Sequence, residues 1–144
     1  MASGVSIARN RTRKVNSVLV LLDCSGSMND GEVAQCLTEI ESVFGEVAGS
    51  VHVWQHDTKI VDKAELKAGQ PIPEFQRKTY GSTCHRRPFA DVIESDVNPD
   101  LVICLTDCQT SYPSEWPKAD VIWISTVPVA SGYVPPVGEL IVIA

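Results

Sequence analysis

The stretch VNSVLVLLDCSGSM, residues 15–28, decides the fold. Its first eight residues are mostly valine and leucine, and the apolar run stops at Asp23, where small polar residues follow. A short unbroken apolar run that ends at turn residues is typical of a strand buried on both faces, and such strands occur mainly in parallel sheets. We therefore predict a central strand over residues 15–23, with a polar turn at its carboxyl end.

Two amphipathic helices are predicted downstream of this strand. The first follows the polar cluster at residues 25–31, and its apolar side chains recur at spacings of four and three residues. That apolar stripe consists of Val33, Leu37, Ile40, Phe44 and Val47. The second helix begins after Thr83 with Pro88 near its first turn, and we expect it to turn Phe89, Val92 and Ile93 inward.

Further short apolar runs predict the remaining strands, with an extended edge segment at residues 60–66. The other predicted strands cover residues 51–56, 101–106, 121–126 and 139–143. Strands that alternate with helices bury their apolar faces by forming one sheet between two helical layers. The predicted fold class is therefore α/β, a doubly wound, mostly parallel open sheet with helices on both faces, in a single domain.

Length and charge limit the domain organisation and the kind of partner. The chain has 144 residues and a formal net charge of −6, which suits one globular domain. Residues 1–14 contain four basic residues and no acid, so we expect a flexible basic N-terminal arm followed by a domain over residues 15–144. That domain carries 8 Lys and Arg against 18 Asp and Glu, and such an acidic surface repels a phosphate backbone. Nucleic-acid binding is not expected.

Cysteine usage and hydropathy predict a cytoplasmic protein that does not contact a membrane. The five cysteines are an odd number without a CxxC pair, which is typical of a reducing compartment. The N-terminus has no apolar segment of the kind found in signal peptides. The longest apolar runs, at residues 18–22 and 140–144, are too short to span a bilayer.

Five oxygen-bearing side chains fall at the predicted carboxyl ends of strands, where open α/β sheets bind their ligands. Two are carboxylates and three are hydroxyls, and they come from three separate segments: Asp23, Ser25, Ser27, Thr83 and Asp107. Hard divalent cations prefer such ligands, and Mg²⁺ in particular accepts one or two carboxylates while it retains water. The sequence therefore predicts a magnesium site that remains open to one further oxygen ligand.

These residues carry a resemblance to a known family. DCSGSM at 23–28, Thr83 in GST and Asp107 in LTDC resemble the metal-ion-dependent adhesion site of von Willebrand factor A (VWA) domains. The order of motifs over residues 15–144 is most similar to the VWA-like domain at the C-terminus of a bacterial putative-metallopeptidase family. Many of those relatives have aspartate and glycine where this chain has Cys84 and Cys108.

The resemblance implies a VWA/Rossmann-like fold and a ligand role for each matching residue. Ser25, Ser27 and Thr83 would contact the metal directly or nearly so, and Asp23 and Asp107 directly or through water. The ion would be Mg²⁺, with Mn²⁺ or Ca²⁺ as substitutes, and an Asp or Glu of a partner protein would complete its coordination. Relatives work alongside AAA-type ATPases or larger complexes, so the resemblance implies a partner of that kind.

The predicted function is therefore metal-dependent protein–protein interaction rather than catalysis. We expect five side chains near the same strand ends to form a partner-binding rim: His56, Asp57, His85, Tyr112 and Trp116. Two other functions stay open at this stage. A metal-dependent hydrolase would need a base, for which only His56, Asp57 and His85 are candidates. A structural subunit of a larger, viral assembly would carry the metal site as a vestige.

Two other chemistries are less favoured by the sequence. Cys24, Cys84, His85 and Cys108 could together form a zinc set, but structural zinc sites usually place their ligands in tightly spaced pairs, which this chain lacks. We expect these thiols to act as small buried apolar groups instead. Asp23 could be a nucleophile for phosphoryl transfer, but that chemistry normally needs a second acid two residues on, where this chain has Ser25.

Overall fold

The computed structural model contains a six-stranded sheet with helical segments packed on it. The structure describes residues 15–24, 28–35, 38, 47–67, 84–108, 111–125, 127–129 and 131–142. Its strands are β1 (Val15–Asp23), β2 (Val47–His56), β3 (Ile60–Lys67), β4 (Leu101–Thr106), β5 (Asp120–Ser125) and β6 (Glu139–Val142). The helices are α3 (Arg86–Glu94) and the short 3-10 helix η1 (Ser131–Tyr133), and residues 30–35 are also helical.

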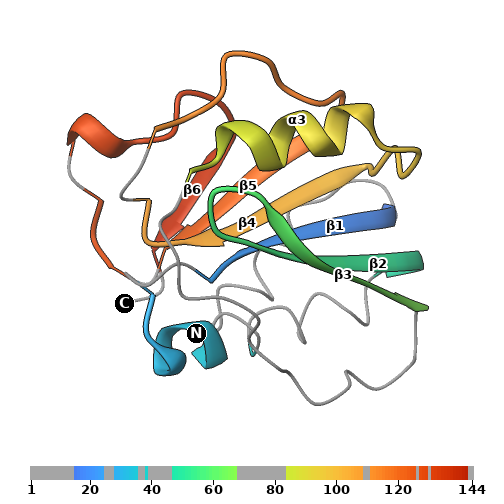
Figure 1. Ribbon diagram of the computed structural model, residues 1–144, viewed down its shortest axis with the longest axis horizontal. Helices are drawn as coiled ribbons and strands as arrows, with labels where there is room; N and C mark the ends of the chain where they lie inside the picture. Colours follow the sequence, from blue (N-terminus) through green and yellow to red (C-terminus); the bar gives the residue numbers. More distant parts are fainter. Residues whose placement is uncertain are drawn as a thin grey trace.

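The strand order is β3-β2-β1-β4-β5-β6, so β1 lies in the interior of the sheet between β2 and β4 (Figure 1). All neighbouring pairs are parallel except β2 and β3, which are antiparallel. The predicted single α/β domain with a mostly parallel open sheet is confirmed. Because parallel strands all end at the same edge, the segments that follow β1, β2, β4 and β5 meet there.

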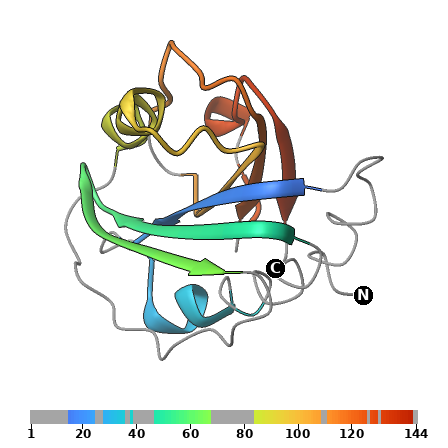
Figure 2. The ribbon, with the colours of Figure 1, turned by 90° about the vertical axis from the view of Figure 1, so that its right-hand side faces the viewer.

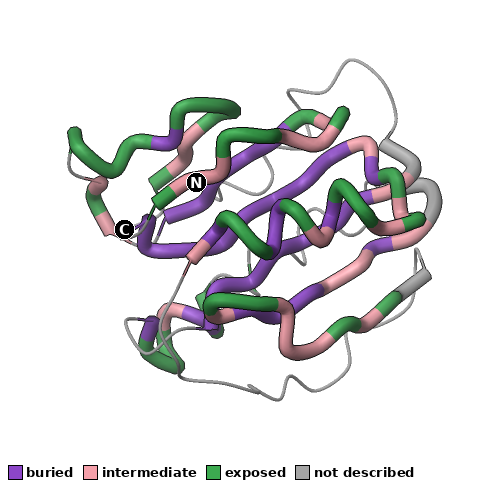
Figure 3. Tube along the Cα trace, turned by 45° about the horizontal axis from the view of Figure 1, so that its top comes forward, coloured by how far each residue is buried: buried purple, intermediate pink, exposed green. Residues whose placement is uncertain are grey.

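Side chains of β1 alternate between two apolar cores, one on each face of the sheet. Val18, Val20 and Leu22 pack with Met28 and Val33. Leu19 and Leu21 face the other way and pack in the core that contains the buried side chains of α3. Figure 2 shows α3 and the helical segment at residues 30–35 on opposite sides of the sheet. The prediction of a strand buried on both faces is confirmed, and Figure 3 shows β1 and β4 buried along almost their whole length.

Helix α3 differs from its prediction at one residue. Phe89 and Val92 are buried as expected, but the side chain of Ile93 is 42% exposed, so its predicted inward position was wrong. The buried stripe of α3 is centred on Pro88 and Val92, which are four residues apart and therefore lie on one line of the helix. Ile93 falls at the border of that stripe, where it meets a groove rather than the core.

The start of β2 also differs from its prediction. Val47 was expected to end the first helix, but it begins β2 and pairs with Val15 of β1. Parallel pairing with β1 therefore extends the strand four residues ahead of the predicted start at residue 51. Val33 is buried, as its place in the helical stripe predicted. The other members of that stripe, Leu37, Ile40 and Phe44, lie outside the described residues.

The remaining strands match their predictions closely. β3 forms the expected edge segment and continues to Lys67, β4 has the predicted bounds, and β5 and β6 differ from their predicted ranges by about one residue. Within the part of the chain that the structure describes, every helix is too short or too polar to cross a membrane.

Candidate functional site

The two carboxylates of the predicted metal site lie at neighbouring strand ends. Asp23 is the last residue of β1, and Asp107 directly follows β4. The register pairs Leu22 with Leu105, which places Thr106 beside Asp23 at the edge of the sheet. Asp23 is fully buried and Asp107 is 3% exposed. The three predicted hydroxyl ligands, Ser25, Ser27 and Thr83, lie outside the described residues.

Thr106 connects the two strand ends through its hydroxyl group. The hydroxyl donates a hydrogen bond of 2.6 Å to Oδ2 of Asp23 and accepts one of 3.1 Å from the backbone N–H of Cys108. All three residues are fully buried, so water does not compete for these bonds. Thr106 was not among the site residues predicted from the sequence. Its only signal is a polar residue at the end of an apolar run, directly before Asp107.

Two histidines pack beneath this hydroxyl group. Nε2 of His85 lies 3.4 Å from Oγ1 of Thr106, and the rings of His85 and His56 meet edge to face at 5.4 Å between centroids. Because the single proton of the Thr106 hydroxyl goes to Asp23, Nε2 of His85 must donate in this contact. Nδ1 of His56 lies 3.0 Å from the carbonyl oxygen of Asp57 and therefore also donates. Each imidazole thus keeps its other nitrogen as a buried lone pair, and within the described part of the chain neither of these nitrogens has a hydrogen-bond partner.

Burial keeps both imidazoles neutral at physiological pH. Desolvation lowers the pKa of His85 to about 3, with a further contribution from the neighbouring His56, while the negative charge of Asp23 acts in the opposite direction. Desolvation also lowers the pKa of His56, again against the opposing effect of Asp23. His56 and His85 therefore form an uncharged, aromatic and fully buried layer beneath this edge of the sheet.

The predicted rim residues divide into two groups by their burial. His56 and His85 have no exposed surface, so neither can touch a partner in this conformation. Asp57, Tyr112 and Trp116 are only partly buried, and so they keep surface for a contact. Trp116 also packs edge to face on Phe89 at 5.2 Å, against the core on the α3 side of the sheet.

Asp57 and Tyr112 are both held in place by hydrogen bonds or ring contacts. The carboxylate of Asp57 accepts a bond from the backbone N–H of Lys59, and its carbonyl accepts one from Cys84. The Tyr112 hydroxyl donates to the carbonyl of Tyr133 at 2.6 Å, and its ring stacks on His85 at 5.7 Å. These contacts join the segment that begins at Cys84 and the one that follows β4 to the same edge of the sheet.

A family model described as a VWA-like domain (DUF2201) matches residues 18–144. The chain belongs to this family. The match covers most of the sequence, and it confirms the resemblance to VWA domains over nearly the whole range in which the motifs were found. No curated protein and no solved structure matches the chain.

The backbone directly after Asp107 is strained. Cys108 has a φ of 61°, in the left-handed region that glycine adopts without cost. A cysteine there costs about 1 kcal/mol or more. In this VWA-like domain the backbone at residue 108 therefore favours glycine over the cysteine that it carries.

The thiols of the zinc alternative are buried or dispersed. Cys24 is fully buried in one core and its thiol donates to Oε1 of Gln55 at 3.6 Å, as expected for a cysteine that turns away from the site. Burial raises the pKa of Cys108 to about 11, which favours the thiol over the metal-binding thiolate. Among the described residues, which include all four members of the zinc set, no three His, Cys, Asp or Glu side chains are placed to hold a metal ion together.

The donors at this edge suit a hard cation better than a soft one. Asp23 ends β1 and Asp107 directly follows β4, so both strand ends carry a carboxylate. The neighbouring Thr106 adds a hydroxyl group, which bonds Asp23. The imidazole next to that hydroxyl donates toward it, so its buried lone pair is on the other nitrogen. Oxygen donors of this type are the ones that Mg²⁺, Mn²⁺ and Ca²⁺ prefer.

Proposed function

We propose that this VWA-like domain binds a partner protein through a divalent cation, with Mg²⁺ as the preferred ion. Its ligands would be Asp23, Ser25, Ser27, Thr83 and Asp107. The observation that carries the proposal is the placement of Asp23 and Asp107 at the ends of two adjacent parallel strands, with Thr106 bonded to Asp23 between them. When bound, such a cation supplies residual positive charge and an exchangeable water position to a carboxylate of the partner.

The residues around the site are suited to holding it rigid. Thr106 fixes one oxygen of Asp23, which leaves the other oxygen for further interactions. His56 and His85 support the edge from below as neutral rings, so they add no positive charge that would compete with a cation. Asp57, Tyr112 and Trp116 are the predicted rim residues with accessible surface, and they would contact the partner directly.

Burial favours a binding function over metal-dependent hydrolysis. A hydrolase needs a general base within reach of a solvent-accessible substrate. The two candidate histidines are fully buried, and the carboxylate of Asp57 is engaged in the turn with Lys59. Hydrolysis would therefore require the edge of the sheet to rearrange, whereas carboxylate capture requires only access to the metal.

The metal half of the proposal is tested by thermal unfolding of the full chain in Mg²⁺, Mn²⁺, Ca²⁺ and chelator. A ligand bound only by the folded state at a hundredfold excess over its Kd adds about 2.7 kcal/mol to the free energy of unfolding. We expect Mg²⁺ to raise the Tm of the wild type but not that of Asp107→Asn or Thr83→Ala. An unchanged Tm at millimolar Mg²⁺, or an equal rise in Asp107→Asn, contradicts the proposed site.

The zinc alternative is tested on the same samples. Cys84→Ser and Cys108→Ser should keep the Mg²⁺-dependent rise in Tm, because oxygen ligation does not involve these thiols. Stoichiometric zinc in the purified protein, released by either substitution, would make the cysteine set the real site.

The partner half is tested by affinity capture from native extract in Mg²⁺ and in chelator. We expect a partner that binds wild type only with the metal, that fails to bind Thr83→Ala, and whose binding depends on one of its own Asp or Glu residues. Candidates include an AAA-type ATPase or a larger complex, as family resemblance implies. Capture that survives both chelation and Thr83→Ala would exclude the adhesion-site mechanism.

A further inference from the structure

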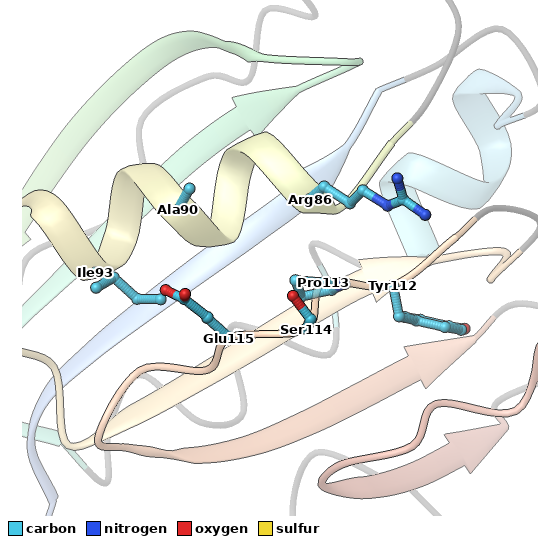
Figure 4. Close-up of a pocket in the computed structure, with 7 residues that line it drawn as sticks. All are labelled: Arg86, Ala90, Ile93, Tyr112, Pro113, Ser114 and Glu115. Atoms are coloured by element: carbon cyan, nitrogen blue, oxygen red, sulfur yellow. The ribbon is translucent and has the colours of Figure 1, made fainter.

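A groove runs along the solvent face of α3, beside the candidate site (Figure 4). One wall is formed by α3 and the other by the segment at residues 112–115, and the groove encloses about 420 Å³. The α3 wall consists of side chains spaced four and three residues apart, which therefore lie on one face of the helix. The lining residues are Arg86, Ala90, Ile93, Tyr112, Pro113, Ser114 and Glu115.

One end of the groove adjoins the candidate site, and this end is basic. Arg86 directly follows His85, whose imidazole contacts the Thr106 hydroxyl that bonds Asp23. Figure 4 shows the guanidinium group of Arg86 extending away from Ile93 and Glu115, toward the end of the sheet at which β4 finishes. A segment lying in the groove would therefore reach the metal site past Arg86.

The charges on α3 run against the helix dipole. Arg86 and Arg87 occupy its first turn without an acidic residue, and the last turn has no basic residue. Both arginines are exposed, and among the described residues neither forms an ion pair. Cations at the positive end of a helix are unfavourable, and here they lie on a protein of net charge −6. An anionic group bound at this end would remove that unfavourable interaction.

The end of the groove away from Arg86 presents apolar surface. Ile93 is one of the few large apolar side chains that the described residues expose, and it lines the groove together with Ala90. Figure 4 shows the side chain of Glu115 reaching toward Ile93 from the opposite wall, so an acidic side chain of a bound segment fits at the Arg86 end and not here. The groove therefore presents a cation next to the metal site and an apolar surface, bordered by one carboxylate, further along.

We propose that this groove binds an extended segment of the partner, in which an acidic side chain pairs with Arg86 and a large apolar side chain packs on Ala90 and Ile93. The proposal rests on the proposed function, because the same partner would supply its metal-binding carboxylate beyond the Arg86 end. Arg86 and Ile93 are seven positions apart on the helix, which is a rise of about 10.5 Å along its axis. The side chain of Arg86 makes the distance from its guanidinium group to Ile93 longer than this rise. Four residues of extended chain span about 13 Å and place both side chains on the same side. The recognised pattern is therefore an acid and a large apolar residue four positions apart.

The test uses a displayed library of random 16-residue peptides selected on the full chain in Mg²⁺, followed by fluorescence anisotropy with labelled synthetic copies of the selected peptides. We expect enrichment of peptides with an acid and a large apolar residue four positions apart. Their affinity should fall at least tenfold in Arg86→Glu and several-fold in Ile93→Ser. No enrichment of this pattern, or equal affinity for Arg86→Glu and wild type, overturns the proposal.

Two matched controls separate the groove from general effects of charge and exposure. Arg87→Glu makes the same charge change one residue away, outside the groove lining, and should bind within about twofold of wild type. Val142→Ser alters a side chain with the same 42% exposure on β6 and should bind as wild type does. The Tm of Arg86→Glu should equal or exceed that of wild type, because an acid replaces a cation at the helix N-terminus. Loss of binding that is explained by unfolding would appear as a lowered Tm.

The same measurements in chelator distinguish this proposal from the metal-dependent function. If the affinity depends on Arg86 and Ile93 but not on Mg²⁺, the groove is right and the metal-dependent function is wrong. If it depends on Mg²⁺ but not on Arg86, the groove proposal is wrong. A homodimer in solution that Arg86→Glu dissociates would identify a second copy of this chain as the occupant, and it would overturn the choice of an acidic partner segment.

Discussion

Replacing Thr106 with valine should destabilise the domain and weaken its metal binding. Valine has nearly the shape of threonine, so the substitution removes the hydroxyl while it leaves the packing in place. Oδ2 of Asp23 then loses a donor at 2.6 Å, and the backbone N–H of Cys108 loses its acceptor at 3.1 Å. The longer contact of 3.4 Å that Nε2 of His85 donates to the same hydroxyl is lost as well. Because all three residues are fully buried, water cannot replace either bond.

The lost bond to Asp23 and the lost bond from Cys108 cost different amounts of free energy. A hydrogen bond to a charged acceptor contributes about 1.5–3 kcal/mol, and an orphaned buried N–H costs about 1–3 kcal/mol. Asp23 makes further interactions, so the lower ends of these ranges apply, and the expected loss is about 2.5 kcal/mol of the free energy of unfolding. For a domain of this size that loss lowers the Tm by roughly 10 °C. Urea and thermal unfolding in chelator measure it.

Thr106→Ser is the matched control, since serine keeps the hydroxyl and removes only a methyl group, at a cost of about 1 kcal/mol. Titration with Mg²⁺ then separates positioning from stability: the valine variant should bind at least tenfold more weakly, as expected when a partner that orients a ligand is lost, and the serine variant close to wild type. Valine and serine variants of equal stability and equal Mg²⁺ affinity would refute this reasoning.

Two further predictions concern the buried histidines, His56 and His85, and the strained backbone at Cys108. In chelator, the free energy of unfolding should fall as the pH falls below about 6.5, because the unfolded chain takes up protons that the buried His85, with its pKa of about 3, does not accept until much lower pH. His56 contributes with the same sign, and His85→Gln should flatten the urea-unfolding profile. At Cys108, whose φ is 61°, the glycine variant should be about 1 kcal/mol more stable than the alanine variant in urea unfolding; the usual order, with alanine ahead, would show that the backbone there is unstrained.

The fold was predictable because its signals are local and strong. Short apolar runs form most of β1 and β4, and polar residues follow each run; their short length and their content of Val and Ile favour strands over helices. Val47 was misplaced because its spacing also fits the preceding helix, and its pairing with Val15 is a contact between distant segments. Ile93 was misplaced because helical periodicity identifies a stripe but not its border, which depends on what packs alongside.

The site was predictable only in part, for a similar reason. Asp23 and Asp107 follow strands, so topology alone brings them to one edge. The rings of Trp123 and Tyr112 pack on His85, and His85 packs on His56 in turn, which no spacing in the sequence encodes. Thr106 was not predicted as a site residue because threonine is common at strand ends. Only the register of the sheet shows that it lies beside Asp23.

The arrangement of charge links these observations to the proposed function. Two nearly fully buried carboxylates on adjacent strand ends are unfavourable in a small domain unless something compensates them. Thr106 offsets part of this cost for Asp23, and both carboxylates make further interactions, but the rings below the site are neutral and contribute no positive charge. Arg86 and Arg87, which directly follow His85, are both exposed, and Arg86 lines the groove beside the site. A bound cation would therefore compensate the negative charge of the two carboxylates. Arg86, which lies beside the site, would select a partner segment with an acidic side chain.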